Sequence, residues 1–269
     1  PVALLATMWR SRRGHGVHER WQERFGFTRA RFEQAPIWVH AVSVGEVQAS
    51  AVLVRALQRR YPERPILVTT GTSTGAGRVA ALFDVDFDFA PIESVLGRSR
   101  YLAPAIRAVP GVRPLGAWDA FELCVRTILG QQVTVAAART LMLRWVERCG
   151  EITPERVLAA DTRQMGIPAK RIESIRSLAQ AVLDRRLRFD ASWPEIEASL
   201  RELPGFGPWT RDYLAIRLGR QSDAFPASDL GLLRVVNADT PKELLQIAER
   251  WRPYRAYAAT YLWVVGARR

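Results

Sequence analysis

Cysteine, histidine and lysine are scarce in this sequence. Its 269 residues hold only two cysteines, Cys124 and Cys149, which are too few for a disulfide framework or a four-thiolate zinc site. The three histidines all lie in the first 40 residues. This composition predicts no metal centre and favours a reducing compartment, so we expect a cytoplasmic location.

Long apolar runs are also missing. The apolar start of the chain, residues 1–9, is followed at once by arginines, and no run approaches the roughly 18 to 20 residues that span a bilayer. The sequence begins without a methionine, which leaves a lost upstream signal or anchor open. Hydrophobic residues make up 48% and charged residues 25% of the chain, as in globular proteins. At about 150 residues per domain, the length predicts one large domain or two modest ones.

The charge is strongly positive and comes almost entirely from arginine. There are 39 Lys and Arg against 27 Asp and Glu, a formal net charge of +12, and the only lysines are Lys170 and Lys242. Arginine makes two-pronged contacts to phosphate, which favours a polyanionic partner such as a nucleic acid or an anionic membrane surface. A codon bias toward arginine would give the same composition, so both readings stay open at this point.

The first 80 residues have the pattern of an α/β unit. Residues 37–42 read as a strand, residues 43–46 as a turn, residues 47–61 as a helix and residues 66–70 as a second strand. A strand, helix, strand order predicts a right-handed parallel crossover. No comparable strand follows, and two parallel strands cannot complete a doubly wound sheet.

From about residue 80 the apolar spacing becomes helical. Thr153 and Thr240, each followed by proline, are expected to cap helices. These features predict an all-α domain. The expected helices are 119–129, 135–149, 170–184, 193–201, 210–218 and 241–251.

A glycine-rich loop and an aspartate carry the functional signal. The loop, Leu203–Thr210, places Gly-Phe-Gly between two helices, an arrangement that brings backbone N–H groups close to a phosphate. Tight turns between helices use glycine for geometry alone, so the loop by itself is a weak signal. Asp229 follows an apolar, proline-containing segment and begins another helix. Its simplest role is that of an N-cap.

Together these segments resemble the helix-hairpin-helix superfamily of DNA glycosylases, most closely the inducible 3-methyladenine DNA glycosylase type. The resemblance rests on Phe121–Ala138, Leu203–Thr210 and Phe225–Leu232, in the family's order, and includes the terminal Trp251–Trp263. It covers about residues 80–265. It implies a mainly α fold, with a helix-hairpin-helix glycosylase domain over residues 79–269.

The resemblance implies that the chain flips an alkylated purine out of duplex DNA and hydrolyses its N-glycosidic bond. Asp229 would be the essential carboxylate, stabilising positive charge on the sugar and orienting or deprotonating water. Trp209, Tyr213 and Trp263 would form the base pocket, because cationic bases stack well on electron-rich rings. Each of the three rings could equally be an ordinary core aromatic.

Further positions carry over to DNA contacts. Gln131 and Gln132 stand where the family probes or fills the gap left by the flipped base; such a wedge is usually apolar, so capping within the loop is the alternative role for Gln132. Arg211 is the first candidate for a phosphate contact. The family's hairpin also commonly holds a structural monovalent cation through backbone carbonyls; no other cofactor is expected. The hairpin residues expected to contact DNA are Gly205, Phe206, Gly207, Thr210 and Arg211.

One position bears on the reaction type. Bifunctional members of the superfamily carry a Schiff-base lysine directly after the hairpin, where this chain has Trp209. We therefore expect a monofunctional glycosylase without lyase activity. The implied partner is double-stranded DNA with alkylated bases, bound by a monomer that associates with the nucleoid when on DNA and needs no protein partner.

Residues 1–78 resemble a different family. Arg20–Gly26, Pro36–Glu46 and Ile66–Gly75 are similar to the N-terminal end of the Kdo (3-deoxy-D-manno-octulosonic acid) transferases, which have two Rossmann-like domains of the glycosyltransferase-B type. In that family the glutamate of Ser-Val-Gly-Glu is the general base, which implies that role for Glu46; a helix first-turn acid is the plainer interpretation. The segment would be a truncated α/β fragment.

Two alternatives to the enzyme hypothesis follow. The family's larger bacterial members carry an antiparallel β domain ahead of the helices that this sequence does not show, so the chain could be a DNA-binding module with impaired catalysis. It could instead be a Kdo transferase fragment, which we expect to be inactive without its donor domain.

Overall fold

The computed structural model has two compact units, Pro1–Ala81 and Leu82–Arg269, which are described separately. The residues that the structure describes are 34–41, 50, 53, 54, 56–58, 60, 61, 63–70 and 88–266.

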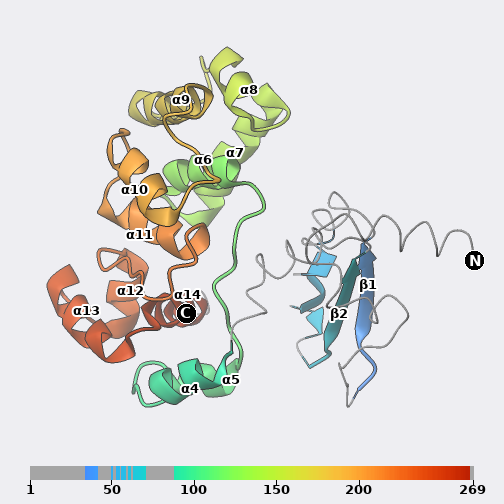
Figure 1. Cartoon of the computed structure of the whole chain (residues 1–269), viewed down its shortest axis with the longest axis vertical. Helices are drawn as coiled ribbons and strands as arrows, with labels where there is room; N and C mark the ends of the chain where they lie inside the picture. Colours follow the sequence, from blue (N-terminus) through green and yellow to red (C-terminus); the bar gives the residue numbers. More distant parts are fainter. Residues whose placement is uncertain are drawn as a thin grey trace, which may run out of the picture. The chain divides into compact units, whose positions relative to one another are not determined.

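In the first unit the two expected strands are present and pair in parallel. Strand β1 (Ile37–Ala41) lies beside β2 (Ile66–Thr70), with Ile37 opposite Ile66 and Ala41 opposite Thr70. The described residues between 50 and 60 are helical, as the crossover pattern predicts (Figure 1). The expected turn at 43–46 and the glycine-rich stretch 71–77 lie outside the described residues.

The regular structure of the second unit is helical over its described length, which confirms the mainly α fold. Helix α7 and helix α10 have the bounds expected from the sequence, and the others that were expected shift by one or two residues or end in a 3-10 turn. Over its described residues, the unit also contains five helices that were not among those expected by residue range: α4, α5, α8, α12 and α14. The elements are α4 (Ala90–Leu96), α5 (Ala103–Ala108), α6 (Ala120–Gly130), α7 (Val135–Cys149), α8 (Pro154–Ala159), α9 (Ala169–Leu183), α10 (Trp193–Arg201), α11 (Pro208–Arg217), α12 (Leu230–Val236), α13 (Pro241–Ala248), η2 (Glu249–Trp251) and α14 (Arg255–Gly266).

Side-chain caps fix where several of these helices begin. Thr153 accepts the backbone N–H of Arg156, and Thr240 accepts that of Glu243, as their positions before Pro-x-x predict. Ser192 and Glu195 form a reciprocal capping box at α10, the helix that leads into the hairpin. The sequence therefore sets the start of α10 locally.

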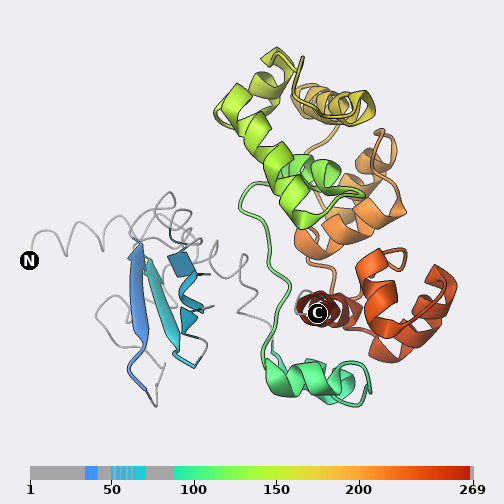
Figure 2. The same ribbon diagram turned by 180° about the vertical axis from the view of Figure 1, so that it is seen from behind.

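The helices bury two separate hydrophobic clusters. The first is built from α6 to α10 and the second from α4, α5 and α12 to α14, which lie toward opposite ends of the unit in Figure 1 and Figure 2. Helix α11 belongs to both, because Leu214 is buried in the first cluster and Ile216 in the second. Whatever α11 carries on its exposed side is therefore positioned by both clusters.

An extended segment, residues 109–118, joins α5 to α6 and so runs from one cluster to the other. Val112 packs against the second cluster and Ala117 against the first. The hydroxyl of Tyr261, a fully buried residue of α14, accepts the backbone N–H of Val112 at 3.1 Å. This bond fixes the segment to α14.

Replacing Tyr261 by Phe is expected to lower the free energy of unfolding by about 1–3 kcal/mol, because the Val112 N–H loses its acceptor in a partly buried place. Denaturant unfolding measures the change. An unfolding free energy equal to that of the wild type would show that the bond does not fix the segment.

Candidate active site and nucleic-acid interface

The hairpin between α10 and α11 requires its first glycine for internal reasons. Gly205 has a φ of +87°, and a Cβ there would lie 2.6 Å from Oγ of the buried Ser174. Gly207, the N-cap of α11, is different: a Cβ on it would meet no atom within 4 Å. The turn thus requires a glycine at position 205, whereas at Gly207 the space beside the backbone is open and a ligand could approach it.

Two other hairpin residues that were expected to contact DNA are buried. Phe206 is 2% exposed within the first cluster and Thr210 is 3% exposed. A DNA contact at either position would come from the backbone, and it stays a prediction.

The glutamine pair divides into an inward and an outward residue. The side-chain amide of Gln131 donates to the carbonyl of Gly205 at 2.7 Å and to Oγ1 of Thr210 at 2.9 Å. The backbone carbonyl of Gln131 accepts a hydrogen bond from the guanidinium of Arg171. Gln132 is exposed, with a φ of +54°. Gln131 therefore ties the end of α6 to the hairpin, and Gln132 is the one that is free to reach a ligand.

These contacts bear on the cation that the family's hairpin commonly holds. The carbonyl of Gly205 already accepts from Gln131 and, at 3.4 Å, from Thr210. Both of its acceptor positions are used. This carbonyl does not fit a cation ligand, and no step proposed below depends on one.

Arg211 turns toward the protein. Its Nη1 donates to the carbonyl of Phe206 at 2.7 Å, and its Nε lies 3.6 Å from Oε1 of Glu197 on α10. The side chain is 18% exposed. Arg211 closes the hairpin onto α10; its expected phosphate contact stays a prediction.

Asp229 is the N-cap of α12, and its two oxygens have different partners. Oδ1 accepts the backbone N–H of Leu232 at 2.9 Å, as a capping aspartate does. Oδ2 accepts the indole N–H of Trp209, also at 2.9 Å, from the first turn of α11. The carboxylate is therefore held by two N–H donors from two helices while its residue remains partly exposed.

The three expected pocket aromatics gather beside this carboxylate. The rings of Trp209 and Tyr213, one turn apart on α11, stack with centroids 5.5 Å apart and planes at 11°. Trp263 of α14 meets Tyr213 edge-on at 5.8 Å and 61°. Tyr213 packs against the first cluster and Trp263 against the second, so the rings meet where the two clusters adjoin.

Sequence reasoning did not anticipate Arg217 at this place. Its Nη1 donates to the Tyr213 hydroxyl at 2.5 Å, and its Cζ lies 5.5 Å from the centre of that ring. The signal was the spacing of residues 209, 213 and 217, which repeats every four residues along one side of a helix.

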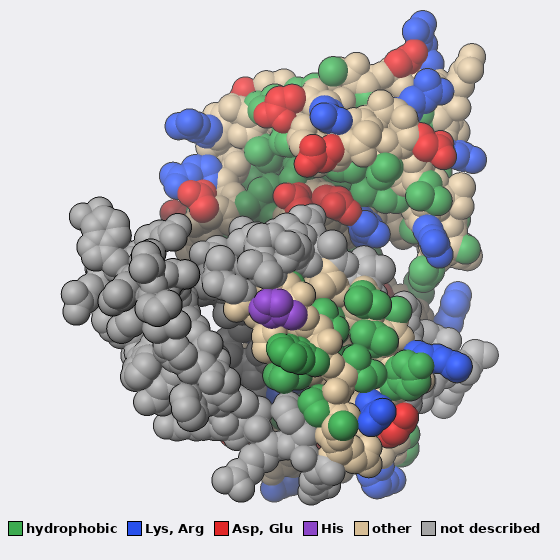
Figure 3. Space-filling view, turned by 90° about the vertical axis from the view of Figure 1, so that its right-hand side faces the viewer, with side chains coloured by type: hydrophobic (Ala, Val, Ile, Leu, Met, Phe, Trp, Pro, Cys, Tyr) green, Lys and Arg blue, Asp and Glu red, His purple; other side chains and the backbone are tan. Residues whose placement is uncertain are grey.

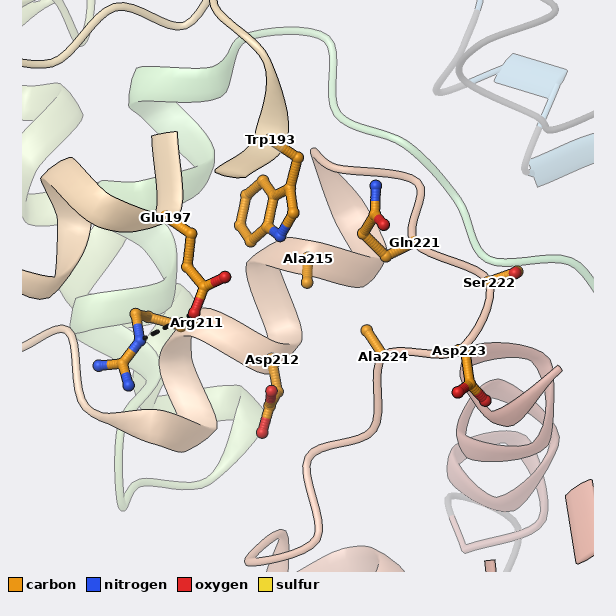
Figure 4. A pocket seen from close by; sticks show the side chains of 9 residues that line it. All are labelled: Trp193, Glu197, Arg211, Asp212, Ala215, Gln221, Ser222, Asp223 and Ala224. Carbon is orange, nitrogen blue, oxygen red and sulfur yellow. Dashed lines mark ion pairs between the residues drawn. The ribbon is translucent and has the colours of Figure 1, made fainter. Parts of the chain in front are cut away.

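A cavity of about 310 Å³ lies beside α11 (Figure 4). It is bounded by α10, α11 and the loop after α11. The pKa of Asp212 is raised to about 6, mainly because the carboxyl is buried; Glu197 also acts to raise it, and Arg211 and Arg255 act to lower it. Its lining residues are Trp193, Glu197, Arg211, Asp212, Ala215, Gln221, Ser222, Asp223 and Ala224.

Many charges are paired across the surface. Arg126 pairs with Glu122 and Arg201 with Glu197, each one turn apart on a helix. Asp223 receives both Arg252 and Arg255. On the visible part of the helical unit in Figure 3, basic and acidic side chains are interspersed. Part of the arginine content therefore serves internal pairing, and the net charge of +12 is not explained by it.

Two other observations concern the described residues alone. Among them no group of histidine, cysteine and acidic side chains could hold a metal ion, and no helix has the length and apolarity to cross a bilayer. Glu46, expected to be the base of a transferase remnant, lies outside them.

Comparison with known proteins identifies the helical part. The model of the HhH-GPD superfamily of base excision DNA repair proteins matches residues 125–252. DNA-3-methyladenine glycosylase 2 of Escherichia coli is 34% identical over 202 residues, 69% of this chain and 70% of that protein. The chain therefore belongs to the helix-hairpin-helix superfamily of base excision repair proteins, among the DNA-3-methyladenine glycosylases.

Another relative is longer. The probable bifunctional transcriptional activator and DNA repair enzyme AlkA of Mycobacterium tuberculosis is also 34% identical, over 71% of this chain, but the match spans 42% of that protein.

The fold agrees with solved structures. A 3-methyladenine DNA glycosylase of Schizosaccharomyces pombe, Mag1, in complex with abasic DNA, superposes with a TM-score of 0.59 at 24% identity, covering 66% of this chain and 97% of Mag1.

The N-terminal part matches a second family. The 3-deoxy-D-manno-octulosonic-acid transferase model covers residues 19–104. The transferase of Haemophilus influenzae is 48% identical over 67 residues, which is 24% of this chain and 16% of that protein. The resemblance stated for the first strands is thus confirmed, and its family match extends into the first helices of the second unit.

The raised pKa of Asp212 gives a pH-dependent prediction. The folded protein holds this proton up to about pH 6, whereas an unfolded aspartate loses it near 3.8, so the Asp212 contribution to stability falls as pH rises between these values. Asp212→Asn removes the titration. We expect the midpoint temperature of the variant to exceed that of the wild type by about 2–4 °C at pH 7.5, with a difference that shrinks toward pH 4. A difference that is independent of pH would contradict the assignment.

Proposed function

We propose that this chain is a monofunctional DNA N-glycosylase that removes alkylated purines, of the 3-methyladenine type, from duplex DNA. The observation that carries the proposal is the arrangement around Asp229: a partly exposed carboxylate, held by two N–H donors, beside aromatic rings from both clusters. Its homologues named as DNA-3-methyladenine glycosylases support the same assignment.

Asp229 would act on the sugar. As the N-glycosidic bond breaks, positive charge develops on the deoxyribose, and a carboxylate facing it lowers the energy of that state. The same group can orient or deprotonate the attacking water. Because an alkylated purine already carries positive charge, it leaves without a strong acid. The hydrogen bonds from Leu232 and Trp209 fix the direction of the carboxylate, so its side chain would not have to be oriented during the reaction.

The flipped base would lie against Tyr213 and Trp263. One face of Tyr213 is covered by Trp209 at a stacking angle of 11°, whereas Trp263 approaches edge-on from the other helix. A cationic base gains from stacking on such rings. Trp209, whose N–H is used by Asp229, then serves the carboxylate and supports the ring of Tyr213.

DNA would be held without sequence reading by the hairpin. The start of α11 presents free backbone N–H groups, and the open backbone at Gly207 allows a phosphate to approach. Gln132, exposed beside the hairpin, is placed to enter the gap left by the flipped nucleotide. A DNA substrate would place the protein in the compartment that holds the DNA, the bacterial cytoplasm.

The reaction would stop at the abasic site. Trp209, after the hairpin, offers no amine for an imine with the sugar, and the two lysines lie on α9 and α13. The transferase-like segment matches 16% of its Haemophilus influenzae relative, and we propose no transferase reaction for it.

Release of free base from alkylated duplex DNA tests the proposal. The wild type is expected to release base and to leave abasic DNA uncut until alkali is added. Asp229→Asn, which keeps the cap, should lower the single-turnover rate by about a hundredfold or more while DNA affinity and its salt dependence persist.

Asp239→Asn is the matched control, because Asp239 is an exposed aspartate just before α13. It should behave like the wild type. No release by the wild type, with salt-sensitive DNA binding intact, would instead establish a binding module; strand cleavage without alkali would contradict the monofunctional assignment.

A further inference from the structure

Helix α11 carries three side chains in a continuous row. Trp209, Tyr213 and Arg217 follow one another at intervals of four residues and therefore lie on one side of the helix. Trp209 stacks on Tyr213, and Tyr213 is contacted by Arg217 at both its hydroxyl and its ring. The row begins at Trp209, which donates to Asp229, and ends at Arg217, two turns along the helix.

The far end of the row is bound to the connecting segment. Arg217 donates through Nε to the carbonyl of Leu115 and through Nη2 to that of Gly116 at 3.4 Å. All of its hydrogen-bond acceptors among the described residues are neutral oxygens, and no carboxylate pairs with it there. A planar guanidinium carries its donors on three nitrogens and so reaches three separate acceptors, whereas the donors of a lysine all lie on one nitrogen.

The same segment is tied to the opposite side of the site. Val112 donates to the hydroxyl of Tyr261 on α14, two residues before Trp263. Residues 112–116 therefore connect α11, which carries Tyr213, to α14, which carries Trp263. The spacing of these two rings therefore depends on this segment, which is hydrogen-bonded to Tyr261 at one end and to Arg217 at the other.

We propose that Arg217 is a positioning residue of the site. It holds Tyr213 against Trp209, and thereby Trp209 on Asp229, and it fixes α11 to the segment that sets the distance to Trp263. This inference rests on the proposed glycosylase function, and Arg217 would act through Tyr213 and through the segment of residues 112–116.

Arg217→Lys tests it, since it keeps the charge and removes the fork. We expect the single-turnover rate of base release to fall by about tenfold or more and the dissociation constant for the same DNA to change by less than about threefold. Arg144→Lys is the control, because Arg144 also donates to a backbone carbonyl, that of Met165, but belongs to α7. The control should release base at the wild-type rate. A wild-type rate in Arg217→Lys, or equal losses of rate and affinity, would overturn the proposal.

A second measurement does not depend on activity. Hydrogen exchange followed by mass spectrometry should show faster exchange in Arg217→Lys both at residues 109–118 and at the start of α12, where the Leu232 N–H donates to the capping Asp229. Faster exchange at residues 109–118 alone would show that Arg217 holds only this segment, and it would overturn the proposed effect of Arg217 on Asp229. If the wild type releases no base, the glycosylase function fails by itself, and the exchange result still decides whether the row couples the segment to Asp229.

Discussion

The indole N–H of Trp209 bound to the carboxylate of Asp229 is the interaction on which the site depends. A lone capping aspartate is common, and a single N–H from its own helix leaves its outer oxygen undirected. Here the second donor comes from another helix, 20 residues earlier in the chain, so the carboxylate is oriented by tertiary structure. Because the same indole stacks on Tyr213, one side chain orients the charge and supports the ring that would receive the base.

This bond forms only if the two hydrophobic clusters hold their helices at the right relative position. Trp209 stands on α11, which shares its buried face between the clusters, and Asp229 begins α12, which belongs to the second. Errors in their relative position would part donor and acceptor. The segment of residues 112–116 limits such errors, because it is bound to Tyr261 on α14 and to Arg217 on α11. Within the first cluster, Gln131 at the end of α6 holds the hairpin.

Local signals allowed much of the fold to be predicted. Proline, threonine and apolar spacing gave the bounds of α7 and α10 and the caps at Thr153 and Thr240, and the parallel strands followed from two β-branched runs. Helix α14 was not assigned because it is buried nearly all round and shows little amphipathic period. For the site, the family resemblance brought Asp229 and the three rings together. The bonds of Gln131 to Gly205 and of Arg217 to Leu115 could not be predicted, because they join segments 74 and 102 residues apart.

Trp209→Phe tests the central claim most directly, since phenylalanine keeps an aromatic ring on Tyr213 and loses the indole N–H together with part of the stacking area. Single-turnover base release and DNA affinity are measured on the same alkylated duplex. Loss of a hydrogen bond to a charged group, about 1.5–3 kcal/mol, predicts a rate lower by about 10- to 150-fold with affinity nearly unchanged. A wild-type rate in this variant would contradict the account, because Asp229 would then need no second donor.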